Sequence, residues 1–197
     1  MPLSGASWVR QFPTSTNIND LEPSFRTKVT EFTGALRAAG AKINVSVTYR
    51  PPQRAYLMHY CWCIWKRKVN PRSVPAFVPQ GSEQPVDIQW LHTLPTGEPD
   101  LPKSYAAAYE MVAAYGMINL GVAPALKSNH TVRKAVDMTI RWTGSLDIKD
   151  KVGLVKKIAS APRDGTNAEL IAVGSTYKVY HFHKVMSDKP HWSYNGR

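Results

Sequence analysis

Near the start of the chain, apolar residues recur with the spacing of one helix face. Phe25, Val29, Phe32 and Leu36 stand at i, i+4, i+7 and i+11, which places them on one side of an α-helix. Gly40 follows as a stop signal. The pattern predicts an amphipathic helix that buries this face in the core.

Two other segments alternate apolar and polar positions and contain many β-branched residues. Residues 43–49 and residues 134–142 both show this period of two, which predicts strands with one buried face. In the second strand Val136 and Met138 belong to the apolar row, so Asp137 points to the opposite face.

Shorter elements are predicted between the Pro and Gly residues of the remaining chain. Ser104 is the predicted N-cap of one helix, and Thr166 or Asn167 that of another. The predicted elements are helices at 53–68, 104–118, 151–160 and 166–174, a strand at 177–185 and a turn at 187–192.

Two segments lack a regular pattern. Residues 1–22 are polar and contain turn signals, which predicts an N-terminal arm on the surface. Residues 69–103 contain seven prolines and are predicted to form an irregular excursion that walls one side of a substrate groove. With 197 residues, 43% of them hydrophobic, the chain is predicted to form a single domain over residues 1–197.

The charge balance favours anionic partners. The chain has 25 Lys and Arg against 14 Asp and Glu, a net charge of +11, and such a chain is attracted to nucleic acid, phospholipid surfaces or anionic wall polymers. The basic residues are scattered without a run of five or six. This argues against nucleic acid, and solubility alone is the plainest alternative.

Cysteines and targeting signals indicate where the chain is made. Cys61 and Cys63 are too close in sequence for an ordinary disulfide and are expected to be buried thiols. No signal-peptide pattern and no apolar run of membrane-spanning length is visible. We therefore expect synthesis in the cytoplasm and no membrane insertion, so that a substrate outside the membrane would require release by other machinery.

Three dispersed residues have side chains that suit a metal. His130 and Asp137 are seven residues apart, and His191 lies near the C-terminus with Asp188 three residues before it. Catalytic zinc sites use three such protein ligands and leave one position for water. In such a site Asp188 would act as general base and Arg50, at the end of a predicted strand, would stabilise the oxyanion. The alternative is a surface histidine and a solvated aspartate.

Three motifs in order resemble one enzyme family. Ser128-Asn129-His130 followed by Ala135-Val136-Asp137 resembles the Ser-x-His-x-x-Gly-x-Ala-x-Asp signature of the D-alanyl-D-alanine carboxypeptidase and dipeptidase family of zinc peptidases. That family includes VanX- and VanY-type enzymes and phage endolysins that cut the L-alanyl-D-glutamate bond. Asp188-Lys189-Pro190-His191-Trp192 is similar to its second signature, and Tyr49-Arg50 with Gln53 to its early Tyr-Arg pair and Gln.

The resemblance implies an α+β fold in which a small antiparallel sheet carries one zinc ion and helices pack on the other face. It implies zinc ligands, a base and a cation at the positions already named, and substrate or outer-layer contacts by further residues. The implied set is His130, Asp137 and His191 as ligands, Asp188 as base, Arg50 as cation, and Tyr49, Gln53, Ser128, His181, His183 and Trp192 as surrounding contacts.

The chain departs from the family pattern at two positions. Arg133 replaces the signature Gly, so the turn after His130 has no residue that takes positive φ freely. Asp188 replaces the more usual Glu, as in some phage endolysins. A rival ligand exists in the His181-x-His183 pair, where the second histidine would replace His191.

Together these observations predict a monomeric zinc metallopeptidase. Its substrate would be bacterial peptidoglycan, cut by an L-alanyl-D-glutamate endopeptidase or a D,D-carboxypeptidase activity with antimicrobial, cell-wall-degrading effect. The enzyme would reach the wall or periplasm after release by a pore or a secretion apparatus. The competing hypothesis is a basic, non-enzymatic binding module for nucleic acid or cell-wall polymer.

Overall fold

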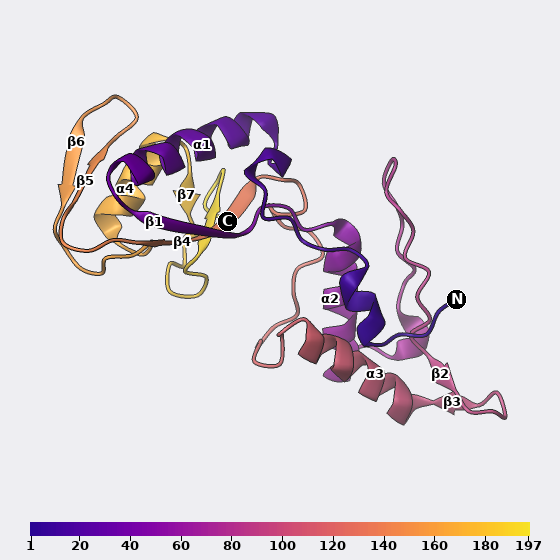
Figure 1. Cartoon of the computed structure of the whole chain (residues 1–197). Helices are drawn as coiled ribbons and strands as arrows, with labels where there is room; N and C mark the ends of the chain where they lie inside the picture. Colours follow the sequence, from indigo (N-terminus) through magenta and orange to yellow (C-terminus); the bar gives the residue numbers. More distant parts are fainter. The chain divides into compact units, whose positions relative to one another are not determined.

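The structure, a computed structural model, describes all residues from 1 to 197. The chain forms two compact units (Figure 1). The helical unit comprises Met1–Pro13 and Pro51–Lys127, and the sheet unit comprises Thr14–Arg50 and Ser128–Arg197. Each unit has its own hydrophobic core. The assignment of the whole chain to one domain stays a prediction.

The sheet unit begins with the helix predicted from the apolar spacing. Helix α1 spans Pro23–Ala38, and the side chain of Glu22 caps it by accepting hydrogen bonds from the Ser24 and Phe25 N–H groups. Phe32 and the other apolar residues of the predicted face are buried. Burial of each such side chain stabilises the fold by about 1.5–3 kcal/mol.

A four-stranded antiparallel sheet packs against α1. Its order is β1-β4-β8-β7, formed by Lys42–Val47, Ala135–Arg141, His191–Ser193 and Tyr180–His181. The apolar row of β4 lies in one core with α1 and with helix α4, Ala168–Thr176. Figure 1 shows both helices beside this sheet. The α+β class with small antiparallel sheets is therefore confirmed.

The segment after β4 forms a hairpin where the sequence predicted a helix at 151–160. Strands β5, Leu146–Lys149, and β6, Val155–Ile158, pair in an antiparallel manner. The Asp150 side chain accepts the Val152 and Leu154 N–H groups and closes the turn. The helix prediction was wrong because this side chain satisfies the turn backbone directly.

The strand and turn predictions near the C-terminus were only partly right. Of the strand predicted at 177–185, only Tyr180–His181 pairs, as β7. The strand starts late because α4 extends to Thr176 and because Lys178 has a φ of 60°, which is not an extended conformation. The predicted turn at 187–192 ends at Pro190, and β8 begins at His191. A strand therefore carries this histidine, as it does Asp137.

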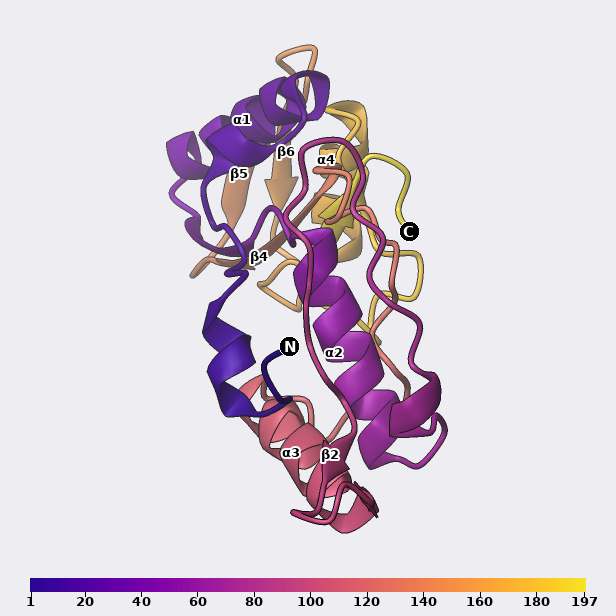
Figure 2. The same ribbon diagram turned by 90° about the vertical axis from the view of Figure 1, so that its right-hand side faces the viewer.

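The helical unit is built on two helices that contact each other (Figure 2). Helix α2 spans Pro52–Trp65 and is buried on most sides, and α3 spans Leu101–Ala114. Asp100 caps α3 by accepting the Lys103 N–H, so the predicted Ser104 cap was wrong. The other elements of this unit are the 3-10 helices η1, Ala6–Arg10, and η3, Pro71–Ser73, with the short strands β2, His92–Thr93, and β3, Pro99–Asp100. The 3-10 helix η2, Ile18–Asp20, belongs to the sheet unit.

The two segments without a regular pattern both contribute to cores. Residues 1–22 were predicted as a surface arm, but Trp8 is buried in the helical unit and Leu21 in the sheet unit. The segment 69–103 is mostly irregular, as predicted, yet Trp90 is buried. In both segments large apolar side chains such as these are buried, although the backbone is mostly irregular.

No helix of the chain combines the length and the apolar character that crossing a membrane requires.

Candidate metal centre

Strand register brings Asp137 and His191 together. The two residues are direct partners across β4 and β8. The Met138 N–H donates to the Pro190 carbonyl oxygen over 2.8 Å, which makes the Asp137–His191 pair a non-hydrogen-bonded one in the ladder. Side chains approach most closely at such pairs. The Asp137 Oδ1 and His191 Nδ1 atoms are accordingly 3.0 Å apart, on the face opposite the helices.

His130 joins this pair from the turn that precedes β4. Its Nε2 atom lies 3.0 Å from Asp137 Oδ1 and 3.2 Å from His191 Nδ1. Within the turn the Lys134 N–H donates to the Asn129 carbonyl oxygen over 2.7 Å. This short return of the chain directs the buried His130 ring toward the sheet.

Arg133 has a backbone conformation that glycine adopts most readily. Its φ is 62°, in the left-handed region. The guanidinium lies 3.6 Å above the centre of the Tyr49 ring, and its Nη1 donates to the Asp20 carbonyl oxygen over 2.8 Å. The Arg133 carbonyl oxygen accepts the Glu22 N–H over 2.9 Å. These contacts offset a backbone strain of about 1–2 kcal/mol, so the turn forms without glycine.

The three converging atoms match the requirements of a metal ion. If both imidazoles donated a hydrogen bond to Asp137, two N–H groups would face each other over the 3.2 Å between His130 Nε2 and His191 Nδ1. A cation at the centre removes this conflict because each nitrogen then presents a lone pair. A tetrahedral ion with bonds of about 2.0–2.1 Å separates its ligand atoms by about 3.3 Å. The three residues could therefore hold a metal ion.

The electrostatics of the group favour a charged Asp137. Burial raises the pKa of this carboxyl, but hydrogen bonds from His130 and then His191 outweigh it and hold the pKa well below its ordinary value. Burial lowers the pKa of His191, but the hydrogen bond and charge of Asp137 outweigh it and raise the pKa above its ordinary value of 6.5. The cluster thus attracts positive charge, as a proton or as a cation.

Asp188 and Arg50 lie near this cluster. The Asp188 Oδ2 atom is 3.9 Å from His191 Nδ1, and its side chain is 48% exposed. Burial and the charge of Asp137 raise the pKa of Asp188. The charges of His191, His130 and Arg50, in that order, act to lower the pKa of Asp188. The Arg50 backbone N–H donates to the His130 carbonyl oxygen over 3.3 Å. A partly solvated carboxylate and a cation thus lie beside the candidate ligands.

The outer ring atoms of the two histidines differ. The His191 Nε2–H can donate to the Arg197 backbone oxygen, 3.1 Å away, which leaves Nδ1 for a metal. Such outer hydrogen bonds orient metal-binding histidines. His130 Nδ1 is buried and has no hydrogen-bond partner. The orientation of His130 therefore depends on its turn and on packing.

Of the two rival histidines, neither belongs to the ligand group. His181 is buried, with its Nε2 atom 2.8 Å from the Lys189 carbonyl oxygen. His183 is exposed, and its Nδ1 atom lies 3.2 Å from the Gly196 carbonyl oxygen. The structure groups His191 with His130 and Asp137. The second histidine of the His-x-His pair is thus placed outside the cluster.

Three other residues that were predicted to surround the site, Tyr49, Ser128 and Trp192, make contacts with other residues of the sheet unit. Tyr49 supports Arg133, and Ser128 closes the turn by accepting the Thr131 N–H at its carbonyl oxygen over 3.0 Å. Trp192 is fully buried beside Phe32 in the core, with ring centres 5.3 Å apart. Trp192 thus has no surface for direct contact with a substrate, because the alternation of β8 turns it away from the His191 face.

Gln53 belongs to the helical unit, where its side-chain amide donates to the Gln84 carbonyl oxygen over 3.0 Å. This bond ties α2 to the proline-containing segment. In that unit the free Cys61 and Cys63 thiols are buried, as predicted. Burial raises the pKa of both thiols.

Sequence reasoning missed two residues that shape the site. Ser46 lies at the β-bulge of β1 opposite Asp137, and its hydroxyl donates to the Asp137 carbonyl oxygen over 3.2 Å. Phe182 packs edge-on against His191, with ring centres 5.7 Å apart. The alternating pattern of β1 contains no signal for the bulge, and Phe182 precedes His191 by a loop whose path only the fold defines.

Comparisons with known proteins identify no family for this chain: no family model, no curated protein and no solved structure matches it.

Proposed function

We propose that the chain is a zinc-dependent peptidase that hydrolyses a stem-peptide bond of bacterial peptidoglycan. The observation that carries the proposal is the Asp188 carboxylate 3.9 Å from His191 Nδ1, beside three donor atoms that converge within hydrogen-bonding distance. The motif resemblance supplies the substrate class. The resemblance is compatible with two activities, an L-alanyl-D-glutamate endopeptidase and a D,D-carboxypeptidase.

The donor set supports zinc as the metal. Two imidazole nitrogens and one carboxylate oxygen, from His130, His191 and Asp137, are ligand types of catalytic zinc sites. When bound, zinc lowers the pKa of water and polarises a carbonyl group. The three donors could hold one ion.

The chain's own residues would then perform two tasks. Asp188 would remove the proton from the attacking water, because its carboxylate is partly solvated and lies beside the ligands. Arg50 would stabilise the negative charge that develops on the scissile carbonyl oxygen. The raised pKa of Asp188 brings this carboxyl closer to neutral pH, where a general base is most effective.

The net charge of +11 supports the choice of substrate. An anionic cell wall would concentrate a basic enzyme at its surface. In this proposal the enzyme acts as a monomer on the wall or in the periplasm, after release through a pore or by a secretion apparatus.

Lysis and metal content together test the proposal. The purified chain and the variants His130→Ala and Asp188→Asn would be compared for turbidity loss of permeabilised Gram-negative cells and for zinc by mass spectrometry. We expect one zinc per wild-type chain. His130→Ala should lose both zinc and lysis. Asp188→Asn should retain zinc and lose at least about 100-fold in rate, as for removal of a general base.

Matched controls separate the roles of these residues. Asp147→Asn removes an exposed carboxylate from the same unit, and His59→Gln removes a histidine from the other unit. Both should retain zinc and lysis. Equal lysis by all variants would rule out the enzymatic proposal, and a metal-free wild type that binds wall fragments would support the binding module. Mass spectrometry of digested muropeptides identifies the bond that is cut.

A further inference from the structure

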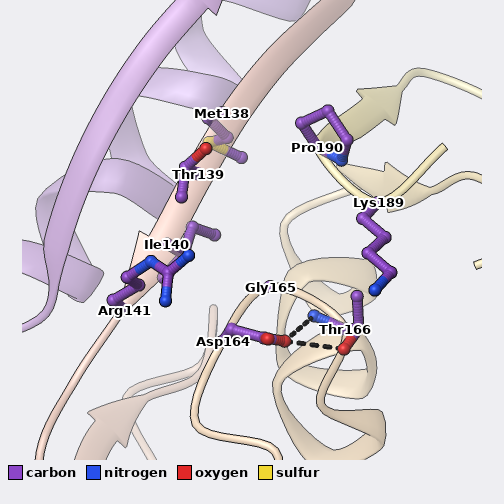
Figure 3. Close-up of a pocket in the computed structure, with 9 residues that line it drawn as sticks. All are labelled: Met138, Thr139, Ile140, Arg141, Asp164, Gly165, Thr166, Lys189 and Pro190. Atoms are coloured by element: carbon purple, nitrogen blue, oxygen red, sulfur yellow. Dashed lines mark hydrogen bonds between the residues drawn. The ribbon is translucent and has the colours of Figure 1, made fainter. Parts of the chain in front are cut away.

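A small cavity lies beside the candidate metal centre. It has a volume of about 180 Å³, and its walls come from β4, from the loop before α4 and from the residues just before β8 (Figure 3). Met138 directly follows Asp137, and Lys189 and Pro190 stand between Asp188 and His191. The cavity therefore shares its walls with the segments that carry two ligands and the proposed base.

The edge of β4 is open inside this cavity. The Met138 N–H donates to the Pro190 carbonyl oxygen over 2.8 Å, but proline has no N–H to return the bond to Met138. Alternation along the strand turns the Ile140 N–H to the same side. Ladder pairing resumes where the Trp142 N–H donates to Arg163. One backbone acceptor and one donor thus face the cavity, as they would face one residue of an extended peptide.

Charged side chains surround the same space. In Figure 3, Arg141 lies on the β4 side, Lys189 on the opposite wall and Asp164 with Thr166 between them. The Thr166 N–H and hydroxyl both donate to Asp164 Oδ1, over 2.8 and 2.6 Å. Burial raises the pKa of Asp164, but these hydrogen bonds and the charges of Arg141 and Lys189 lower it. Two cations thus face one carboxylate whose Oδ1 is already occupied.

We propose that this cavity is a subsite for a substrate residue that carries a free carboxylate. The N–H of that residue would donate to the Met138 carbonyl oxygen, and the oxygen on its carbonyl carbon would accept the Ile140 N–H. Its carboxylate would contact Arg141 and Lys189. The excess of one positive charge favours an anionic group here. This inference rests on the proposed function, because it adds a charge requirement to the same substrate.

The location of the subsite sets the distance to the scissile bond. Ile140 is three residues beyond Asp137 on β4, and an extended strand rises about 3.3 Å per residue. The recognised carboxylate would therefore belong to a residue about 10 Å along β4 from Asp137, or about three positions along an extended substrate.

A binding experiment tests the subsite without requiring hydrolysis. The full chain would be titrated with N-acetylglycine and with N-acetylglycinamide, which differ only in the carboxylate, while backbone amide resonances are followed by NMR. We expect N-acetylglycine to shift the amides of Ile140, Gly165 and Lys189. It should bind about tenfold more tightly than the amide probe, as for one charge-assisted hydrogen bond.

Two variants of equal charge distinguish the cavity from general attraction. Arg141→Gln should weaken N-acetylglycine binding by about tenfold. Arg37→Gln, on the exposed face of α1, should leave it unchanged. Equal binding of both probes, no binding of either, or equal effects of the two variants would overturn the subsite. Selective binding by a chain that fails to cleave peptidoglycan would support the subsite and refute the proposed function instead.

Discussion

A single methyl group on helix α4 should disturb the candidate metal centre. Gly174 lies inside α4, where replacement of glycine by alanine ordinarily stabilises a helix by about 0.5–1 kcal/mol. Here a Cβ atom would lie 2.6 Å from Trp192 Cζ3, 3.0 Å from the Val179 carbonyl oxygen and 3.2 Å from Phe32 Cζ. None of these neighbours is the end of a flexible side chain. Gly174→Ala should therefore destabilise the protein.

The magnitude follows from two opposing effects. Overpacking of a filled core costs about 1–3 kcal/mol, and rigid rings on two sides place Gly174→Ala near the upper value. Subtraction of the helix gain of up to about 1 kcal/mol leaves a net loss of about 2 kcal/mol. In a chain of this size each kcal/mol lowers Tm by about 2–4 °C. Displacement of Trp192 would also shift His191, its neighbour on β8, so zinc affinity should fall.

Thermal unfolding and zinc titration measure both effects. Ala172→Gly, at an exposed position of α4, is the control and should cost only about 0.5–1 kcal/mol. Trp192→Phe removes the atom in closest conflict, so the double variant should be more stable than the sum of the single effects predicts. A Tm of Gly174→Ala at or above the wild-type value would refute the reasoning.

Three further outcomes are expected. Arg133→Ala should lower the free energy of unfolding by about 1 kcal/mol more than Arg133→Gly, measured in urea, because only Gly takes positive φ without strain. In the metal-free protein, protonated His191 contributes stability that is present below its ordinary pKa of 6.5 and lost as pH rises through the raised pKa. Zinc must displace that proton, so zinc affinity, measured by chelator competition, should increase from about pH 6 to about pH 8. Cys61 and Cys63 should resist a thiol reagent until urea unfolds the chain, because burial raises the pKa of both; rapid labelling of the native protein would contradict this.

Periodicity predicted the elements that carry most of the candidate site. The apolar spacing from Phe25 to Leu36 identified α1, and alternation identified β1 and β4, including the face on which Asp137 lies. Both signals are local consequences of side-chain geometry. They needed no knowledge of partners in space.

Predictions failed where a distant or specific contact decided the local structure. The 151–160 segment contains helix-compatible residues, but the Asp150 side chain caps a turn and Ile158 joins the core of the sheet unit. Trp192 sits next to a metal-ligand candidate in sequence, yet it packs against Phe32 because neighbouring strand residues face opposite sides. Arg133 takes a glycine conformation because Tyr49 and Asp20, far away in sequence, hold its side chain.

The sequence by itself determined the buried faces of α1, β1 and β4 and supplied the candidate donor residues, because these depend on local spacing and side-chain chemistry. Only the tertiary structure decided that His130, Asp137 and His191 meet, because their approach depends on the β4–β8 register and on the return of the chain before β4. It also decided the open edge of β4, since Pro190 leaves the Met138 carbonyl oxygen without its ladder partner. The pairing of distant strands depends on how the whole unit packs. A short stretch of sequence carries no information about that packing.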